Sequence, residues 1–208
     1  MTLVKSIDSV VDWLQQNVCQ QITFKLPDDD RNDASNNVEF VHPVALPLFT
    51  PGKEYLPPSV PAPIPSVCVQ LLEGADDLLK KQRRLNVRLC LACWNPGLHS
   101  DELLNPTEDA NALMGFSYST ENKDAMQKYA RNMNGWRDTF NFLDLVLREL
   151  EGTEYINGLR LVKEADIKYG VFNEDGHFID YYPYWISWVS FTLEAGVVVK
   201  PLPYEDLL

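Results

Sequence analysis

The chain has 208 residues, of which 45% are apolar and 23% are charged, and its formal net charge is −12. This composition is typical of a soluble globular protein, and the length predicts a single domain over residues 1–208. The acidic balance disfavours specific nucleic-acid binding, because phosphate backbones are repelled unless basic residues gather on one face. The one basic cluster, KKQRR at residues 80–84, lies at the tip of a predicted hairpin. Such a cluster is more typical of a solvated turn than of a DNA-binding site.

Targeting signals are not evident in the chain. No run of about 18 apolar residues occurs, so no membrane span is predicted. The N-terminal segment contains acids and a helical period, without the basic start and continuous apolar stretch of a signal peptide. We therefore expect the protein to stay in the cytoplasm where it is made, with four reduced cysteines: Cys19, Cys68, Cys90 and Cys93.

The first 65 residues predict one helix and a long extended segment. Residues 2–20 predict an amphipathic helix, followed by a short strand over 22–26 and an acid-rich loop over 28–37. The apolar stripe of this helix consists of Leu3, Ile7, Val10, Leu14 and Val18. Residues 43–65 hold eight of the fourteen prolines, so this segment is expected to be extended and neither helical nor a central strand. Its interleaved apolar residues suggest that it packs along the body of the protein.

The middle of the chain predicts a hairpin, a loop and a helix. Residues 65–74 and 84–94 are strand-like and flank a charged turn, which predicts an antiparallel hairpin. A long loop is expected over residues 95–120. The strongest helical period runs over residues 121–150, and Gly152 is its predicted end. Asn134–Gly135 predicts a break that separates a shorter helix from the main one after it.

The last part of the chain predicts more strands. Residues 156–170 read as a strand region, and a hairpin turn is predicted at residues 174–176. Residues 181–195 read as the longest strand, and 200–208 as a C-terminal arm. The order of elements predicts an α+β fold, in which an antiparallel sheet carries the N-terminal helix and a long central helix on one face, with the proline-rich segment added.

The aromatic segment YYPYWISWVSFTLEA has two dissimilar halves. Strand alternation places Trp185, Ser187, Val189, Phe191 and Leu193 on one face, and Tyr184, Ile186, Trp188, Ser190, Thr192 and Glu194 on the other. From Ser190 onward one face is apolar and the other polar, whereas both faces are apolar before it. We expect a second layer, either the proline-rich segment or another subunit, to cover the first half. Tyr182, Tyr184 and Trp188 are therefore the candidate interface residues.

The pair Cys90 and Cys93, with His99 and Cys68, raises the hypothesis of a zinc or redox site. Residues three apart on a strand point to opposite faces, however, and redox CxxC motifs begin helices. No nucleophile, metal or phosphate motif occurs elsewhere. We accordingly expect no catalytic residue, no cofactor, no bound metal and no enzyme activity.

The element order resembles that of the tail-terminator, or tail-completion, proteins of tailed bacteriophages and prophages. The segments that carry this resemblance are LVKSIDSVVDWL, PSVCVQLLEG with RLNVRLCLACW, WRDTFNFLDLVLREL leading to LRLVKEADIKYG, and YYPYWISWVSFTLEA. The resemblance implies a structural protein of the virion tail, assembled in the cytoplasm of the bacterial host. It would form a ring through heterologous contacts that close, terminate the tail tube and meet the head connector. Its partners would be other copies of itself, the tail-tube protein and the head–tail connector protein, and acidic residues in the lumen would let DNA pass.

Two other classes remain open at this point. The first is a small cytoplasmic binding or regulatory module that uses the proline-rich segment. The second is a metal or thiol enzyme that uses the region of Cys90 and Cys93.

Overall fold

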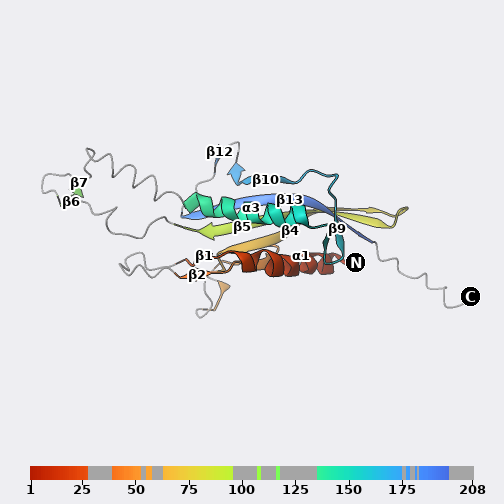
Figure 1. The fold of residues 1–208 in the computed structure, drawn as a ribbon, viewed down its shortest axis with the longest axis horizontal. Coiled ribbons are helices and arrows are strands. Elements are labelled where there is room, and N and C mark those ends of the chain that lie inside the picture. The colour runs from red at the N-terminus through yellow and green to blue at the C-terminus, as the bar shows by residue number, and fades with distance from the viewer. Residues whose placement is uncertain are drawn as a thin grey trace, which may run out of the picture.

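A curled, mixed β-sheet forms the body of the protein (Figure 1). The structure, a computed structural model, describes residues 1–27, 39–52, 55–57, 63–95, 107–108, 116–117, 135–174, 177–178, 181 and 183–196. Its seven-stranded sheet has the order β3-β4-β5-β13-β9-β8, and β10 also pairs with β13. The strands of this sheet are β3 (Val44–Pro47), β4 (Ser66–Asp77), β5 (Gln82–Trp94), β8 (Tyr155–Ile156), β9 (Leu159–Leu161), β10 (Lys168–Val171) and β13 (Tyr184–Gly196).

The remaining elements are shorter. Two α-helices are described, α1 (Leu3–Asn17) and α3 (Trp136–Gly152), together with the 3-10 turn η1 (Cys19–Gln21). Three two-stranded ribbons complete the described part of the chain: β1 (Phe24–Lys25) with β2 (Phe40–Val41), β6 (Thr107–Glu108) with β7 (Phe116–Ser117), and β11 (Asn173–Glu174) with β12 (His177–Phe178).

The predicted α+β fold with an antiparallel sheet and a long central helix is wrong. The described fold is mostly β, and the sheet is mixed because β3 pairs parallel to β4. Helix α3 has 17 residues and starts only at Trp136. The preceding part of the predicted helix, residues 121–134, lies outside the described residues. The start of α3 directly after Gly135 and its end at Gly152 agree with the predicted break at Asn134–Gly135 and the predicted end.

The parallel strand β3 explains the error in the sheet type. It lies within the proline-rich segment and runs in the same direction as β4, with Val44 opposite Ser66 and Pro47 opposite Val69. Pro47 is tolerated because β3 is an edge strand, where a missing N–H breaks no ladder bond. The outward N–H of Ala45 is used by the side chain of Gln15, whose Oε1 accepts it at 3.0 Å. This edge is therefore closed to a further strand.

The predicted hairpin of residues 65–74 and 84–94 is confirmed, and it is longer than expected. Strands β4 and β5 pair antiparallel until Asp77 meets Gln82, so only residues 78–81 form the turn. Strand β13 then pairs with β5 along its whole length, from Tyr184 opposite Trp94 to Gly196 opposite Gln82. We call the two ends of the sheet the Tyr184 end and the Gly196 end, after the first and last residues of β13.

Both helices cover the same face of the sheet, which we call the inner face; the opposite one is the outer face. The two helices and the inner face form one continuous apolar core. Helix α1 contributes Val10 and Leu14, and α3 contributes Phe142, whose ring lies 5.1 Å from that of Phe24. The N-cap of α1 is Thr2, whose hydroxyl accepts the N–H of Lys5 at 3.3 Å. The inner face of the sheet therefore supplies folding energy and is not free to bind a partner.

Two further hairpins, β11–β12 and β8–β9, can be compared with the sequence prediction. The pairing of Glu174 with His177 agrees with the hairpin predicted at residues 174–176, of which residues 175 and 176 lie outside the described residues. The hairpin of β8 and β9 was not predicted, although its turn residues Asn157 and Gly158 both have positive φ, 45° and 90°. Asn-Gly is the strongest sequence signal for such a turn. The predictions for the loop 28–37 and the arm 200–208 lie outside the described residues, as does most of the loop 95–120.

Candidate functional site

The two faces of β13 have the residues that alternation predicted. Ser187, Val189 and Phe191 are buried in the inner face, whereas Ile186, Trp188, Ser190 and Thr192 lie half-buried on the outer face. Glu194 is an outer-face residue that is also buried, because Arg84 and Arg160 hold it from two sides. The first half of the strand was predicted to be apolar on both faces. In the structure, the outer one of these faces lies at the Tyr184 end.

The three candidate interface residues differ in their surroundings. Tyr184 is exposed and lines a groove, whereas Tyr182 lies outside the described residues. Trp188 is half-buried: its indole N–H donates to the carbonyl oxygen of Val171 at 3.2 Å, and the Arg88 guanidinium lies 5.2 Å from its ring centroid. Trp188 is therefore held between β10 and β5, and Tyr184 is the more accessible of the two described residues.

A groove of about 390 Å³ lies on the outer face at the Tyr184 end, and we call it the outer groove. The proline-rich segment forms one wall and Phe172 with Tyr184 another, above a floor provided by β4, β5 and β13. The floor residues are Cys68, Gln70, Cys90, Ala92 and Ile186, and the proline-rich wall consists of Phe49, Thr50, Pro51, Gly52, Pro63 and Ile64. The expected second layer over the first half of β13 is thus supplied in part by residues 49–52 and 63–64.

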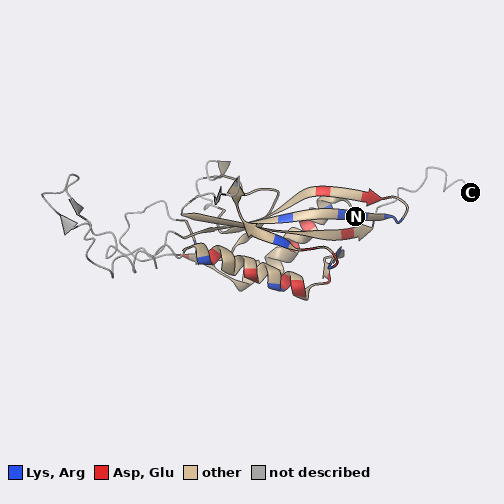
Figure 2. Cartoon of the chain, turned by 90° about the horizontal axis from the view of Figure 1, so that it is seen from above, with Lys and Arg blue, Asp and Glu red and all other residues tan. Residues whose placement is uncertain are grey.

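The parts of the strands that form this floor carry no charged residue. No Asp, Glu, Lys or Arg occurs in residues 66–72 of β4, 89–94 of β5 or 184–193 of β13. The charged residues of these strands lie toward the Gly196 end, as Figure 2 shows by the tan strands at one end and the blue and red residues at the other. An uncharged, partly apolar groove favours the burial of apolar groups of a partner.

The cysteines in the outer groove are Cys68 and Cys90, which lie directly opposite each other on neighbouring strands. The thiol of Cys68 is 2.8 Å from the hydroxyl oxygen of Thr50, and the thiol of Cys90 donates to Gln70 Oε1 at 3.4 Å. Burial raises the pKa of the Cys68 thiol, and burial with the nearby Cys68 raises the pKa of Cys90 to about 11. Both thiols are thus protonated at neutral pH, which makes them weak nucleophiles.

The hypothesis of a site shared by Cys90 and Cys93 does not match the geometry. Cys93 is fully buried on the inner face, where burial raises its thiol pKa far above the usual value, while Cys90 is on the outer face. His99 lies outside the described residues. Within the described residues, no three His, Cys, Asp or Glu side chains are grouped in a way that could hold a metal ion. The fold instead brings Cys68 opposite Cys90, a pairing that spacing along the chain does not reveal.

A second hollow of about 340 Å³ adjoins the Tyr184 end between α3 and β10. It is lined by Trp136, Phe140, Trp185 and Ile186, among others. Trp136 and Phe140 are 42% and 39% exposed, and their rings meet edge to face at 5.7 Å. Exposed aromatic side chains therefore continue around the Tyr184 end from the outer face onto the start of α3. Aromatic residues are enriched in the cores of protein–protein interfaces.

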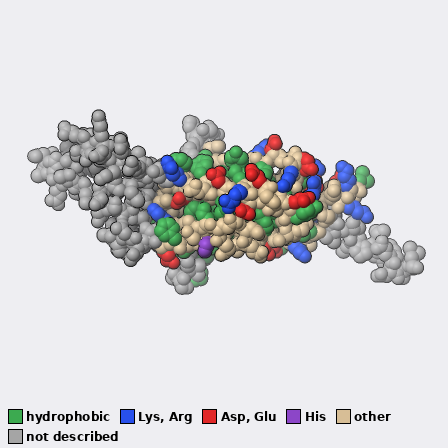
Figure 3. Space-filling view, viewed as in Figure 1, with side chains coloured by type: hydrophobic (Ala, Val, Ile, Leu, Met, Phe, Trp, Pro, Cys, Tyr) green, Lys and Arg blue, Asp and Glu red, His purple; other side chains and the backbone are tan. Residues whose placement is uncertain are grey.

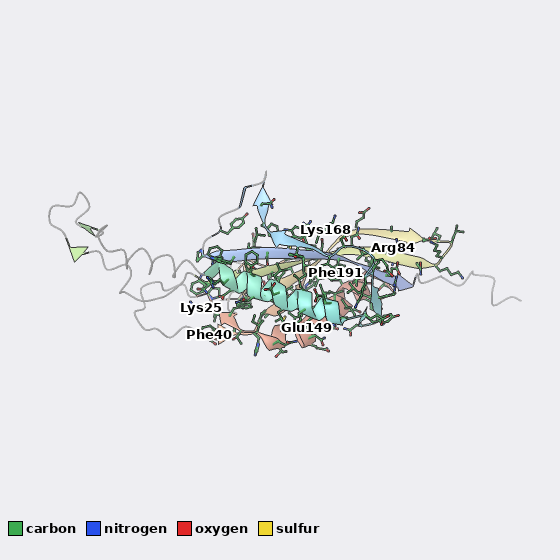
Figure 4. All side chains as sticks on the ribbon, turned by 45° about the horizontal axis from the view of Figure 1, so that its top comes forward. Lys25, Phe40, Arg84, Glu149, Lys168 and Phe191 are labelled. Carbon is green, nitrogen blue, oxygen red and sulfur yellow. The ribbon has the colours of Figure 1, made fainter. Side chains whose placement is uncertain are left out.

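A polar network fixes the start of α3 beside this hollow. Asn95 accepts from Lys25 Nζ at 2.9 Å, donates to Asp138 Oδ2 at 2.7 Å, and receives the indole N–H of Trp185 on its backbone carbonyl at 2.8 Å. Partial burial lowers the pKa of Lys25, and Asp138 opposes that shift. Gly135 is required here, because a Cβ at this position would lie 2.6 Å from the Trp185 indole nitrogen. Figure 4 shows Lys25 and Phe40 at this end and Arg84 toward the other.

We compared the chain with protein-family models, curated proteins and solved structures, and none of the three comparisons gave a match. In the part of the chain that the structure describes, neither helix combines the length and the apolar character needed to cross a membrane.

Proposed function

We propose that the protein is a structural subunit of a bacteriophage or prophage tail, which assembles with copies of itself into a ring at the end of the tail tube. In this role it stops tube growth and offers its other side to the head–tail connector. The subunit acts by binding other proteins and not by catalysis. It functions in the virion tail after assembly in the cytoplasm of the bacterial host.

The observation that carries this proposal is the apolar surface at the Tyr184 end. Large side chains that remain exposed there include Phe49, Tyr184, Trp136 and Phe140, around two hollows with few polar groups. A surface of this kind costs solubility unless a partner covers it. The closed edge at β3 adds support, because it blocks strand pairing at that edge and so favours assembly through side-chain contacts.

The resemblance to tail-terminator proteins supplies the specific role. The segments that carry it correspond here to α1, the β4–β5 hairpin, α3 with β9 and β10, and β13. The protonated thiols of Cys68 and Cys90 fit a contact surface better than a thiol-based active site. The acidic net charge suits a ring through which DNA passes without adhering.

A deletion experiment in the phage or lysogen that encodes the chain tests this role. Loss of the gene should leave tails of irregular length, or tails without heads, in negative-stain electron micrographs. Expression of the chain from a plasmid should restore particles of normal form. Normal infectious particles from the deletion strain, with no trace of the chain in purified wild-type particles by mass spectrometry, would contradict the proposal.

A further inference from the structure

The turn of the β4–β5 hairpin exposes two leucines that no folding contact explains. Leu78 is 77% and Leu79 is 97% exposed, and Lys80 and Lys81 follow them. We call residues 78–81 the hairpin tip. Apolar and basic side chains lie together at this end of the molecule in the space-filling view (Figure 3). Adjacent, nearly fully exposed leucines at a turn are unusual, because turns favour polar residues and glycine.

The hairpin tip is held in a defined shape. The Asp77 carboxylate accepts the N–H groups of Leu79 and Lys80 at 3.1 and 3.0 Å, and Lys81 completes the turn with a φ of 54°. Behind it, Arg83 makes a two-pronged bond to Asp76 with both distances 2.6 Å, and also donates to the Met1 carbonyl oxygen. A braced tip loses little conformational entropy when it docks, which favours binding.

The hairpin tip and the outer groove lie at opposite ends of the same sheet. The tip directly precedes Gln82, the first residue of β5, whereas Cys90 and Ala92 in the groove floor lie near the other end of that strand. At roughly 3.3 Å per residue the separation is about 30 Å, so a tip cannot enter the groove of its own chain. Any contact between the two must join different molecules.

We propose that the hairpin tip of one copy inserts Leu78 and Leu79 into the outer groove of the next copy. This inference rests on the proposed assembly of the protein with itself. The groove offers Phe49, Pro51, Ile64 and Ile186 as apolar contacts, and its volume is within the range of sites that bury small organic groups. Each copy then carries one donor and one acceptor, which produces a head-to-tail contact of the kind that closes into rings.

Charge favours a second copy as the occupant. Residues 76–84, which span the tip and its base, contain four basic and two acidic residues, while the rest of the chain contains fourteen basic and twenty-eight acidic ones. A basic tip is thus attracted to the acidic body of another copy and is repelled by its tip. This repulsion between basic tips disfavours tip-to-tip association.

Two variants of the full chain test the contact by analytical ultracentrifugation. Leu78→Ser with Leu79→Ser removes the apolar tip, and Ala92→Phe fills the groove floor. Each variant should bind itself at least about 100-fold more weakly than the natural chain, because two leucine side chains lose their burial. Val4→Ser, which removes another exposed aliphatic side chain, should leave association unchanged.

Mixing the two variants gives the decisive result. The groove variant has an intact tip and the tip variant an intact groove, so the mixture should form a 1:1 heterodimer that grows no further. A mixture that remains monomeric, a tip variant that associates like the natural chain, or a natural chain that stays monomeric at millimolar concentration would each overturn the contact. Circular dichroism confirms that both variants fold.

The outcome is separable from that of the proposed function. If the tip variant rescues the deletion strain fully, the chain still serves the tail but uses another surface for its assembly. If the chain is absent from particles and the heterodimer nevertheless forms, the contact stands and the tail role falls.

Discussion

Strand β13 meets two different environments on the outer face of the sheet. At the Gly196 end, the buried Glu194 accepts hydrogen bonds from Arg84 at 2.9 Å and from Arg160 at 2.8 Å, so charged groups satisfy one another within the chain. At the Tyr184 end, the same face carries Ile186 and Tyr184 over an uncharged groove. The inner face is the same apolar core at both ends. Charged groups of the chain itself thus complete one end of the outer face, whereas the other end is the surface that we propose for a partner.

The largest effects should come from the inner face and should be similar at both ends. Leu91 lies near the Tyr184 end and Leu193 near the Gly196 end, and both are fully buried. Leu91→Ala and Leu193→Ala should each lower the free energy of unfolding by about 3 kcal/mol, since each leaves a cavity in the core. Urea denaturation measures both. A loss below about 1 kcal/mol at one end only would show that the core is not continuous.

A smaller loss of stability is expected at Trp188, between the two ends. Trp188→Ala removes the hydrogen bond to Val171 and the contact with Arg88, and should cost about 2 kcal/mol in thermal or urea unfolding. Ser190→Ala, two residues along on the same face, is the matched control and should cost well under 1 kcal/mol. Equal effects of the two changes would mean that β10 does not fix Trp188.

Glu194 should make stability depend on pH at the Gly196 end. The bonds from Arg160 and then Arg84 lower the pKa of this carboxyl below its usual value of about 4.5. Its contribution is therefore complete above pH 4.5 and disappears as the pH falls through the lowered value, because the unfolded chain takes up the proton first. Glu194→Gln should cost about 1 kcal/mol at pH 7 and less at pH 3.

Melting temperatures of the natural chain and of Glu194→Gln, measured from pH 7 to pH 3, test this pH-dependent difference in stability. Glu164→Gln is the control, since Glu164 is 71% exposed and its ion pair with Arg160 is longer, at 3.5 Å. A gap between the natural chain and Glu194→Gln that widens on acidification would contradict the assignment.

The smallest effect on stability, but a clear effect on assembly, is expected at Tyr184. Tyr184→Ala should change the free energy of unfolding by less than about 0.5 kcal/mol, because the side chain is exposed, and should weaken self-association. Tyr169→Ala removes an exposed tyrosine on β10 that does not line the outer groove. Sedimentation velocity compares the two variants. Equal weakening would remove the distinction between the groove and the remaining surface.

The sequence predicted the elements whose signals are local. The periodicity of α1, the alternation in β13 and the hairpin of β4 and β5 each depend on neighbouring residues, and all three elements are found. The pairing of β3 with β4 could not be predicted, because it depends on where the proline-rich segment leads the chain. The Asn157–Gly158 turn could have been, since its dipeptide is a strong hairpin signal.

The candidate site was predictable only in part. Two apolar faces in the first half of β13 indicated a covered surface, and Tyr184 lies there. The groove itself depends on Phe49, Ile64 and Phe172, which lie far apart in the sequence and are brought together by the sheet. The leucines of the hairpin tip were visible in the sequence, but only the structure shows that they remain exposed.

The central claim is that the Tyr184 end is a contact surface between proteins. Hydrogen–deuterium exchange of backbone amides, compared between dilute monomer and the concentrated assembly, tests it most directly. Assembly should slow exchange in residues 49–52, 63–64 and 184–186, which line the outer groove, and leave α1 unchanged. Slower exchange confined to α1 and the exposed side of α3, with the groove segments unaffected, would contradict the account.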